Sequence, residues 1–448
     1  MKRIPGRNSS VLTGKWWARI AAGMALMCAP SLAVAQTPPP QDPLAPNAVT
    51  PPVTRKPTPQ NLSFGLFVTE GMDFVNWTDD RPGVITDNRI SQNSMFSGFN
   101  ASLSYSQLGD QKSYTAAAGA DLRYYTLEPA VVPSNFYGGA AISTRLSKRI
   151  ALRGSGNFGY SPFYSFGSFL LPSSVNEVRI PSSDQNIARM DTYTSGGSAT
   201  LFWLLNNRSS IYGGYSLDYV TTPNAAYKVF SQGANVGFQR QMTRYFNLRL
   251  GYGYRKSEQY VLGLPYFNVH TIDTGVGYRR PISSSRRTTL GLSAGSSLLS
   301  QGGLRAFTVT GDASLTYQMK RTWSTGVFYT RGISKVGGML TPFVTDSVSG
   351  NISGLWSRRF GFTGSGGLSL GSSALLFQNT YDAIYASGRF HYDLSRHVPV
   401  YVEYVYYQYE FSQPGGLAAG FPMSVRRSGI RGGLGWSTPL VGQRLDRQ

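Results

Sequence analysis

The stretch FTVTGDASLTY at residues 307–317 alternates apolar or small residues with polar ones. Phe307, Val309 and Leu315 belong to the first set, and Thr308 belongs to the second. Because successive side chains of a β-strand point to opposite faces, the alternation predicts a strand with one apolar and one polar face. A membrane-spanning strand needs ~9–11 residues, which this stretch supplies. Similar stretches lie at residues 114–124, 211–219 and 398–406.

Short polar segments, most of them basic, interrupt this alternation about every 40 residues. They lie at 109–110, 147–149, 206–208, 243–244, 283–287, 320–321, 357–359 and 395–397. Longer segments lie between them, at 77–94, 161–190, 259–266, 332–342 and 412–423. Two long strands, a short turn and a longer loop in each repeat are typical of an outer-membrane barrel, with short periplasmic turns and longer extracellular loops.

The predicted fold is therefore an all-β, transmembrane, antiparallel up-and-down β-barrel of about 18 strands, with both ends on the short-turn side. Glu70 and Asp73 interrupt the first predicted strand, and without it the count would be about 16. The predicted strands are 62–76, 95–107, 112–125, 135–147, 150–160, 191–205, 209–222, 229–241, 245–258, 267–280, 287–299, 304–318, 322–332, 343–356, 360–372, 380–394, 398–411 and 425–438.

The chain outside the predicted barrel has three parts. Residues 1–35 hold five basic residues, no acidic residue and a short apolar stretch that ends in a small-x-small site, which predicts a cleaved secretory signal. Residues 36–60 are rich in proline, which predicts a disordered periplasmic segment that could dock a periplasmic partner. The barrel is expected over 61–440, and a C-terminal tail over 441–448. The single cysteine, Cys28, lies inside the signal, so no disulfide is expected.

The composition is unusual for a soluble domain. Only 14% of the residues are charged, against roughly 25% in an average protein, while the chain holds 28 Tyr, 24 Phe and 51 Gly. No apolar run approaches the ~20 residues of a membrane helix. The net charge of +20 would favour polyanions as partners. For an exported chain, anionic lipid headgroups and anionic solutes are better candidates than nucleic acid.

Aromatic residues lie where two interfacial girdles would need them. One set flanks the short turns and the other lies near the opposite strand ends: Phe246, Trp323, Trp356 and Phe360, and Tyr124, Tyr219, Tyr254 and Tyr329. The segment 428–436 resembles the C-terminal assembly signal of outer-membrane barrels, although the tail 437–448 departs from it. Over roughly 61–440 the chain thus resembles porin-like outer-membrane proteins in architecture. This resemblance implies outer-membrane lipid, lipopolysaccharide and the barrel-assembly machinery as partners.

The sequence predicts no catalytic, cofactor or metal site, and no enzyme. His270, His391 and His397 are far apart in the chain, whereas a metal site needs two or three convergent ligands. An outer-wall lipase would need a Ser–His pair, but no spacing singles out a serine. The repeat length also suits a β-propeller, but each period holds two long strands rather than four short ones.

The polar face of the strands supplies the candidate functional residues, because charges that line a pore determine its ion preference. The basic candidates are Arg123, Arg145, Arg153, Arg249, Arg255, Arg279, Arg389, Arg427 and Arg431. The acidic candidates are Asp121, Asp218, Asp273, Asp312, Asp393 and Glu403. They predict a mild preference for anions. Alternatively, these charges pair between neighbouring strands and stiffen the wall, which we expect for more than half of them.

Three functions remain open from the sequence. A passive channel for small solutes, with a mild preference for anionic ones, is the first. Its candidate constriction is the segment 161–190, and lower conductance is expected when Arg389, Arg427 and Arg431 are neutralised. The second is an export barrel for an exopolysaccharide or another polymer, in which residues 36–60 dock a partner. The third is a structural or surface-interaction barrel with a filled lumen.

Overall fold

The computed structural model describes most of the chain from Gln60 to Gly442. The described residues are 60–78, 93–109, 111–126, 134–165, 186–222, 227–243, 245–259, 267–281, 288–301, 303–319, 322–334, 342–374, 380–395, 397–412 and 423–442. The predicted signal, almost all of the Pro-rich segment and most of the predicted long loops lie outside them.

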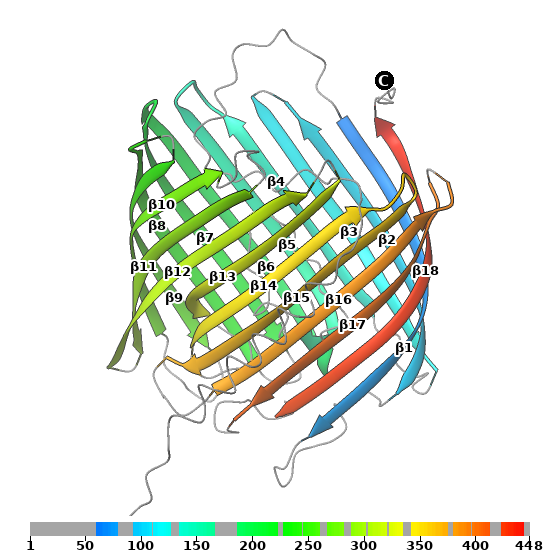
Figure 1. The fold of residues 1–448 in the computed structure, drawn as a ribbon. Coiled ribbons are helices and arrows are strands. Elements are labelled where there is room, and N and C mark those ends of the chain that lie inside the picture. The colour runs from blue at the N-terminus through cyan, green and yellow to red at the C-terminus, as the bar shows by residue number, and fades with distance from the viewer. Residues whose placement is uncertain are drawn as a thin grey trace, which may run out of the picture.

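The described residues form 18 strands in one sheet. Figure 1 shows them as tilted neighbours around a closed wall. The strands are β1 (Gln60–Thr78), β2 (Ser94–Leu108), β3 (Lys112–Tyr125), β4 (Ser134–Arg145), β5 (Ile150–Ser165), β6 (Asn186–Asn206), β7 (Ser209–Thr222), β8 (Tyr227–Gln241), β9 (Phe246–Gln259), β10 (Phe267–Pro281), β11 (Thr288–Gln301), β12 (Leu304–Met319), β13 (Trp323–Ser334), β14 (Phe343–Leu355), β15 (Phe360–Ser373), β16 (Thr380–Asp393), β17 (Pro399–Phe411) and β18 (Ser424–Gly442).

The sheet closes on itself, which confirms the predicted up-and-down barrel. Each strand pairs antiparallel with its neighbours in the chain, and β1 also pairs with β18 from Asn61–Gly442 to Thr78–Ser424. The closure leaves no unpaired sheet edge. The strand that Glu70 and Asp73 were expected to weaken is therefore complete. Asp73 faces the lumen, and Glu70 lies on the outer face, where the Ser97 hydroxyl donates a hydrogen bond to it (3.0 Å).

Several strand ends extend further than the alternation predicts. β5 continues to Ser165 and β6 begins at Asn186, so the outer parts of the predicted loop 161–190 are strand. The register shifts between Ser161 and Phe163, and this irregularity accommodates Pro162 within the pairing. β18 likewise runs to Gly442, beyond the expected barrel end at residue 440. The centre of the predicted constriction, residues 166–185, lies outside the described residues.

Four of the short turns share one sequence pattern and one arrangement of hydrogen bonds. These turns coincide with regularly spaced basic segments of the sequence. In each, an apolar residue precedes a Ser or Thr, and a further apolar residue follows three positions later: 146–150, 242–246, 356–360 and 394–398. In the turn at 357–360, the Ser357 hydroxyl accepts hydrogen bonds from the backbone N–H groups of Arg359 (3.3 Å) and Phe360 (3.1 Å). The backbone N–H of Trp356 donates to the carbonyl of Phe360 (3.0 Å). Basic residues fit the solvent-exposed tip of such a turn.

The two faces of the wall differ as the alternation requires. The outward residues are large and apolar, and many are exposed, among them Phe307 at 69%, Val309 at 59% and Phe158 at 60%. A soluble protein rarely exposes so many neighbouring apolar side chains, whereas a lipid-facing wall needs them. At the short-turn end, Trp356 stacks on Phe360 and on Phe390, with ring centroids 5.0 and 6.0 Å apart.

Candidate functional site

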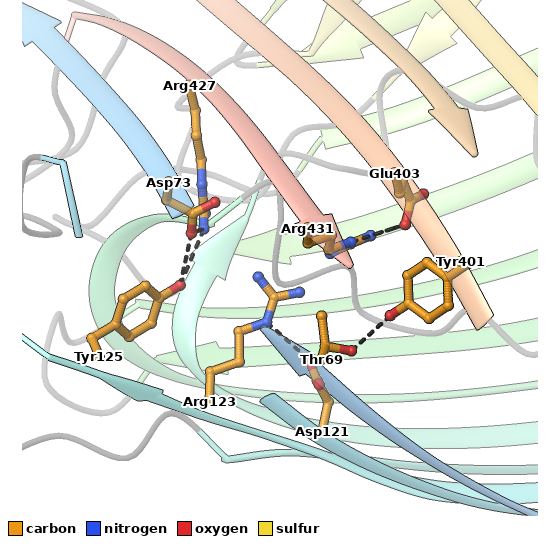
Figure 2. A network of polar contacts seen from close by, with 9 residues as sticks. All are labelled: Thr69, Asp73, Asp121, Arg123, Tyr125, Tyr401, Glu403, Arg427 and Arg431. Atoms are coloured by element: carbon orange, nitrogen blue, oxygen red, sulfur yellow. Dashed lines mark hydrogen bonds and ion pairs between the residues drawn. The ribbon is translucent and has the colours of Figure 1, made fainter. Parts of the chain in front are cut away.

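Large polar residues gather on one sector of the inner wall, formed by β16, β17, β18, β1, β2 and β3. These six strands are consecutive neighbours in the closed sheet. Figure 2 shows the side chains that β1, β3, β17 and β18 contribute to it. We call this group the charged sector, which comprises Thr69, Asp73, Asp121, Arg123, Tyr125, Arg389, Tyr401, Glu403, Arg427 and Arg431.

Glu403 on β17 lies between two arginines from the adjacent strands. In the strand register Glu403 is directly opposite Arg389 on β16 and Arg431 on β18. Its Oε2 accepts hydrogen bonds from Arg389 Nη2 (2.7 Å) and Arg431 Nε (2.9 Å). Two arginines share one carboxylate, so the group carries a net charge of +1. The Arg389 side chain is 41% exposed, whereas those of Arg431 and Glu403 are 13% and 10% exposed. The exposed positive charge therefore belongs to Arg389.

A second group is buried near the loop end of the sector. Arg427 on β18 forms an ion pair with Asp73 on β1. The Tyr125 hydroxyl, from β3, donates to Asp73 Oδ2 (3.1 Å) and accepts from Arg427 Nη2 (3.2 Å) (Figure 2). A buried ion pair is tolerated when further hydrogen bonds satisfy both partners, as here. The contact also needs Gly429, because a Cβ there would lie 2.6 Å from Asp73 Oδ1.

A third contact joins β1 and β17 across the intervening strand β18, which contributes no side chain to it. The hydroxyls of Thr69 on β1 and Tyr401 on β17 are 2.6 Å apart (Figure 2). Gly433 lies between them, and a Cβ there would approach Tyr401 Cε1 to 2.7 Å. The Tyr401 ring also lies 4.5 Å from the Arg389 guanidinium carbon, which fixes the orientation of the exposed arginine.

The remaining inner wall is mainly small and neutral. Several serine hydroxyls on adjacent strands are hydrogen-bonded in pairs. They include Ser63–Ser104 (2.6 Å), Ser155–Ser198 (2.8 Å), Ser324–Ser353 (2.9 Å), Ser347–Ser369 (2.9 Å) and Ser365–Ser387 (2.8 Å). Such pairs keep these parts of the wall polar without adding charge.

The exposure of the inward side chains decreases along the barrel axis, from the short turns to the loop end. Near the short turns and mid-wall, inward residues such as Ser104, Thr115, Thr316, Ser324 and Thr363 are exposed. At the loop end, every strand except β13 carries a buried inward residue among those described. These are Val75, Phe96, Tyr125, Asn135, Ser161, Thr192, Thr222, Ser231, Ser257, Val269, Leu299, Thr308, Phe343, Ser373, Tyr381, Phe411 and Val425. The inward side chains are therefore exposed toward the short-turn end and buried at the loop end.

The structure places the predicted lumen charges as follows. Six of them, Asp121, Arg123, Arg389, Glu403, Arg427 and Arg431, meet in the charged sector, where Arg123 Nε lies 3.5 Å from Asp121 Oδ2. Elsewhere on the wall, Arg153 lies over the Phe202 ring at 5.2 Å and Asp312 accepts a hydrogen bond from Ser293. Alternation and pairing also place Arg145, Asp218, Arg249, Arg255 and Asp393 on the inner face. Asp273 and Arg279 belong to β10, but their side chains lie outside the described ones.

Sequence reasoning missed Asp73 and the burial at the loop end. Asp73 appeared as an interruption because its partner Arg427 lies 354 residues later in the chain. The three histidines do not converge. His391 lies over Gly361 in the lumen, His270 contacts Tyr252 on the outer face, and His397 Nδ1 donates to the Ser437 carbonyl beside a turn.

Within the described residues, no group of three or more His, Cys, Asp or Glu side chains could hold a metal ion. The described part of the chain has no helix long and apolar enough to cross a membrane.

Comparison with known proteins finds similarity at the level of solved structures. No protein-family model and no curated protein matches the chain. The barrel is similar to Pseudomonas aeruginosa OpdQ, with a TM-score of 0.45 and 11% identity over 85% of this chain and 98% of that one. P. aeruginosa OccK2 (OpdF) in complex with glucuronate has a TM-score of 0.43 and 8% identity, covering 85% and 98%. Acinetobacter baumannii OccAB4 has a TM-score of 0.42 and 9% identity, again covering 85% and 98%. These similarities are too distant to support a function.

Proposed function

We propose that this chain is a passive outer-membrane channel for small solutes, with a weak preference for anions. One observation carries the proposal: Arg389 presents a half-exposed guanidinium to the lumen, while the Glu403 carboxylate that balances it is shared with Arg431. The apolar outer wall and the closed antiparallel barrel of 18 strands support a location in the outer membrane.

The charge of the sector can act on passing ions because the Arg389 guanidinium is exposed to the lumen. Paired serines line much of the lumen, and their hydroxyls can replace water around a polar solute. Two unit charges about 4 Å apart interact by ~4 kcal/mol at an effective dielectric constant of 20, and by ~1 kcal/mol in bulk water. A net charge of +1 in a wide, hydrated pore therefore favours anions only modestly.

Single-channel conductance tests the channel function itself. The purified protein, refolded without residues 1–35, would be inserted into a planar bilayer. Stable open steps are expected because the inner wall is polar and its side chains are exposed toward the short-turn end. A silent barrel that still shows heat-modifiable migration and β-structure would reject the channel.

A filled barrel with a structural or surface role is the second candidate. The ring of buried inward residues at the loop end favours it, because side chains that are packed there have little contact with water in the lumen. The absence of ion conductance in the planar bilayer at all voltages would support the filled barrel over the channel. Polymer export, assisted by residues 36–60, remains a prediction of the sequence. Deleting residues 37–60 should impair export but leave passive conductance unchanged.

A further inference from the structure

The outer face of β7–β10 carries a group of polar residues near the loop end, on a wall that is otherwise largely apolar. Alternation along each strand points these side chains away from the lumen. On three adjacent strands, Gln232 is opposite Lys256 and Lys256 is opposite Asn268. We call this group the outer polar patch, which comprises Tyr215, Tyr219, Lys228, Gln232, Tyr252, Tyr254, Lys256, Glu258, Asn268 and His270.

Hydrogen bonds hold three tyrosine hydroxyls of the patch beside other polar side chains. Tyr215 donates to Gln232 (3.1 Å), and Tyr254 donates to Asn268 (3.0 Å). The Tyr252 hydroxyl is 2.8 Å from His270 Nδ1. The patch is therefore an organised polar surface rather than scattered side chains.

Two lysines give the patch its charge. Lys228 Nζ lies 5.6 Å from the Tyr219 ring centroid, at the start of β8. Lys256 Nζ lies 2.7 Å from Glu258 Oε1, and both side chains are 31% exposed. The patch thus holds two lysines and one carboxylate. Tyrosine hydroxyls and amide groups add hydrogen-bonding capacity around them.

The outer surface becomes apolar immediately below the patch. Val236 on β8, Leu250 on β9 and Ile272 on β10 are 53%, 44% and 49% exposed. Charged side chains facing hydrocarbon are destabilising, so the change from apolar to polar marks the membrane interface.

We propose that the outer polar patch binds the phosphorylated sugar headgroup of a lipopolysaccharide molecule in the outer leaflet. Lysine amines complement the lipid phosphates, and the Tyr, Gln and Asn side chains suit the sugar hydroxyls. The site lies on the outer face, so it is separate from the pore. The proposal rests on the outer-membrane location proposed above, with the loops on the outer side.

Thermal unfolding of the full mature barrel in detergent, with and without added lipopolysaccharide, tests this site. We expect the lipid to raise the unfolding temperature of the wild type, and phosphatidylcholine or inorganic phosphate to have no such effect. In the double variant Lys228→Gln/Lys256→Gln, about thirtyfold more lipid should be needed, since each of the two cations contributes ~1 kcal/mol near an anionic headgroup. The variant Arg305→Gln removes an exposed cation from β12, outside the patch, and should behave as the wild type.

Each outcome decides the question. An equal lipid response in the double variant and the wild type would overturn the proposal. A response to phosphate alone would show an anion site rather than a lipid site, and loss of a dimer in the double variant would show an interface between two copies. Conductance should be unchanged in the double variant, so a failed pore and a failed lipid site are distinguishable.

Discussion

The Asp73 carboxylate and the Arg427 guanidinium form a buried ion pair between β1 and β18, the two strands that close the barrel. Both residues are nearly inaccessible to water, at 6% and 3% exposure. Barrel closure therefore depends on electrostatics as well as on backbone pairing.

Replacing Asp73 with Asn should destabilise the barrel by about 3–5 kcal/mol, because the Arg427 charge would remain buried without its carboxylate. The midpoint of urea unfolding in detergent or lipid would measure the loss. The double variant Asp73→Asn/Arg427→Met should lose less than the two single variants combined. If the losses of the single variants simply add, the ion pair does not stabilise the seam.

The same geometry corrects one expectation from the sequence. Neutralising Arg427 was expected to lower conductance, as for Arg389, but Arg427 is buried with Asp73 and Tyr125. We now expect Arg427→Gln to reduce the yield of refolded barrel, measured by heat-modifiable migration. Arg389→Gln should refold as the wild type does. Normal refolding of Arg427→Gln with altered ion selectivity would contradict this assignment.

Replacing Ser357 with Ala should cost about 1 kcal/mol, because the backbone N–H groups of Arg359 and Phe360 lose their hydroxyl acceptor. Ser357→Asp, which keeps an acceptor, should retain most of the stability. The matched control is Ser195→Ala on the outer face of β6, outside any turn. A Ser357→Ala barrel as stable as this control would show that the turn motif depends on backbone pairing alone.

Thiol labelling can test the change in burial along the lumen. In a Cys28→Ser background, Thr363→Cys and Ser324→Cys should react quickly with a water-soluble maleimide, because both positions are exposed. Ser373→Cys and Thr222→Cys should react at least tenfold more slowly, since both positions are 1% exposed. Equal rates at the four positions would show that the loop end of the lumen is open.

Most of the fold is predictable because its signals are local. A stretch such as 307–317 reveals its two faces within a few residues, and the turn at 356–360 repeats a recognisable construction. The extension of β5 past Pro162 was not predictable, because proline normally ends pairing and a register shift accommodates it here. The strand register that brings Arg389 and Glu403 together was not visible either, although alternation placed both residues on the inner face.

The partners of the charged sector depend on contacts between distant parts of the chain. In the sequence Asp73 interrupts the alternation of the first strand. Only closure of the barrel brings its partner Arg427 beside it. Burial at the loop end is also non-local, because the buried inward residues come from nearly all of the strands. Alternation therefore indicates the face on which Arg389 and Glu403 lie, but not that Arg389 would be the exposed member of its group.

The reversal potential across a planar bilayer under a salt gradient tests the central claim most directly. The wild type should be anion-selective, and Arg389→Gln should shift the reversal potential toward zero, because the remaining Glu403–Arg431 pair is neutral. Arg426→Gln, which removes an exposed cation from the outer face of β18, should leave it unchanged. A cation-selective wild type, or equal potentials in the wild type and Arg389→Gln, would contradict the assignment of the charged sector as the selectivity element.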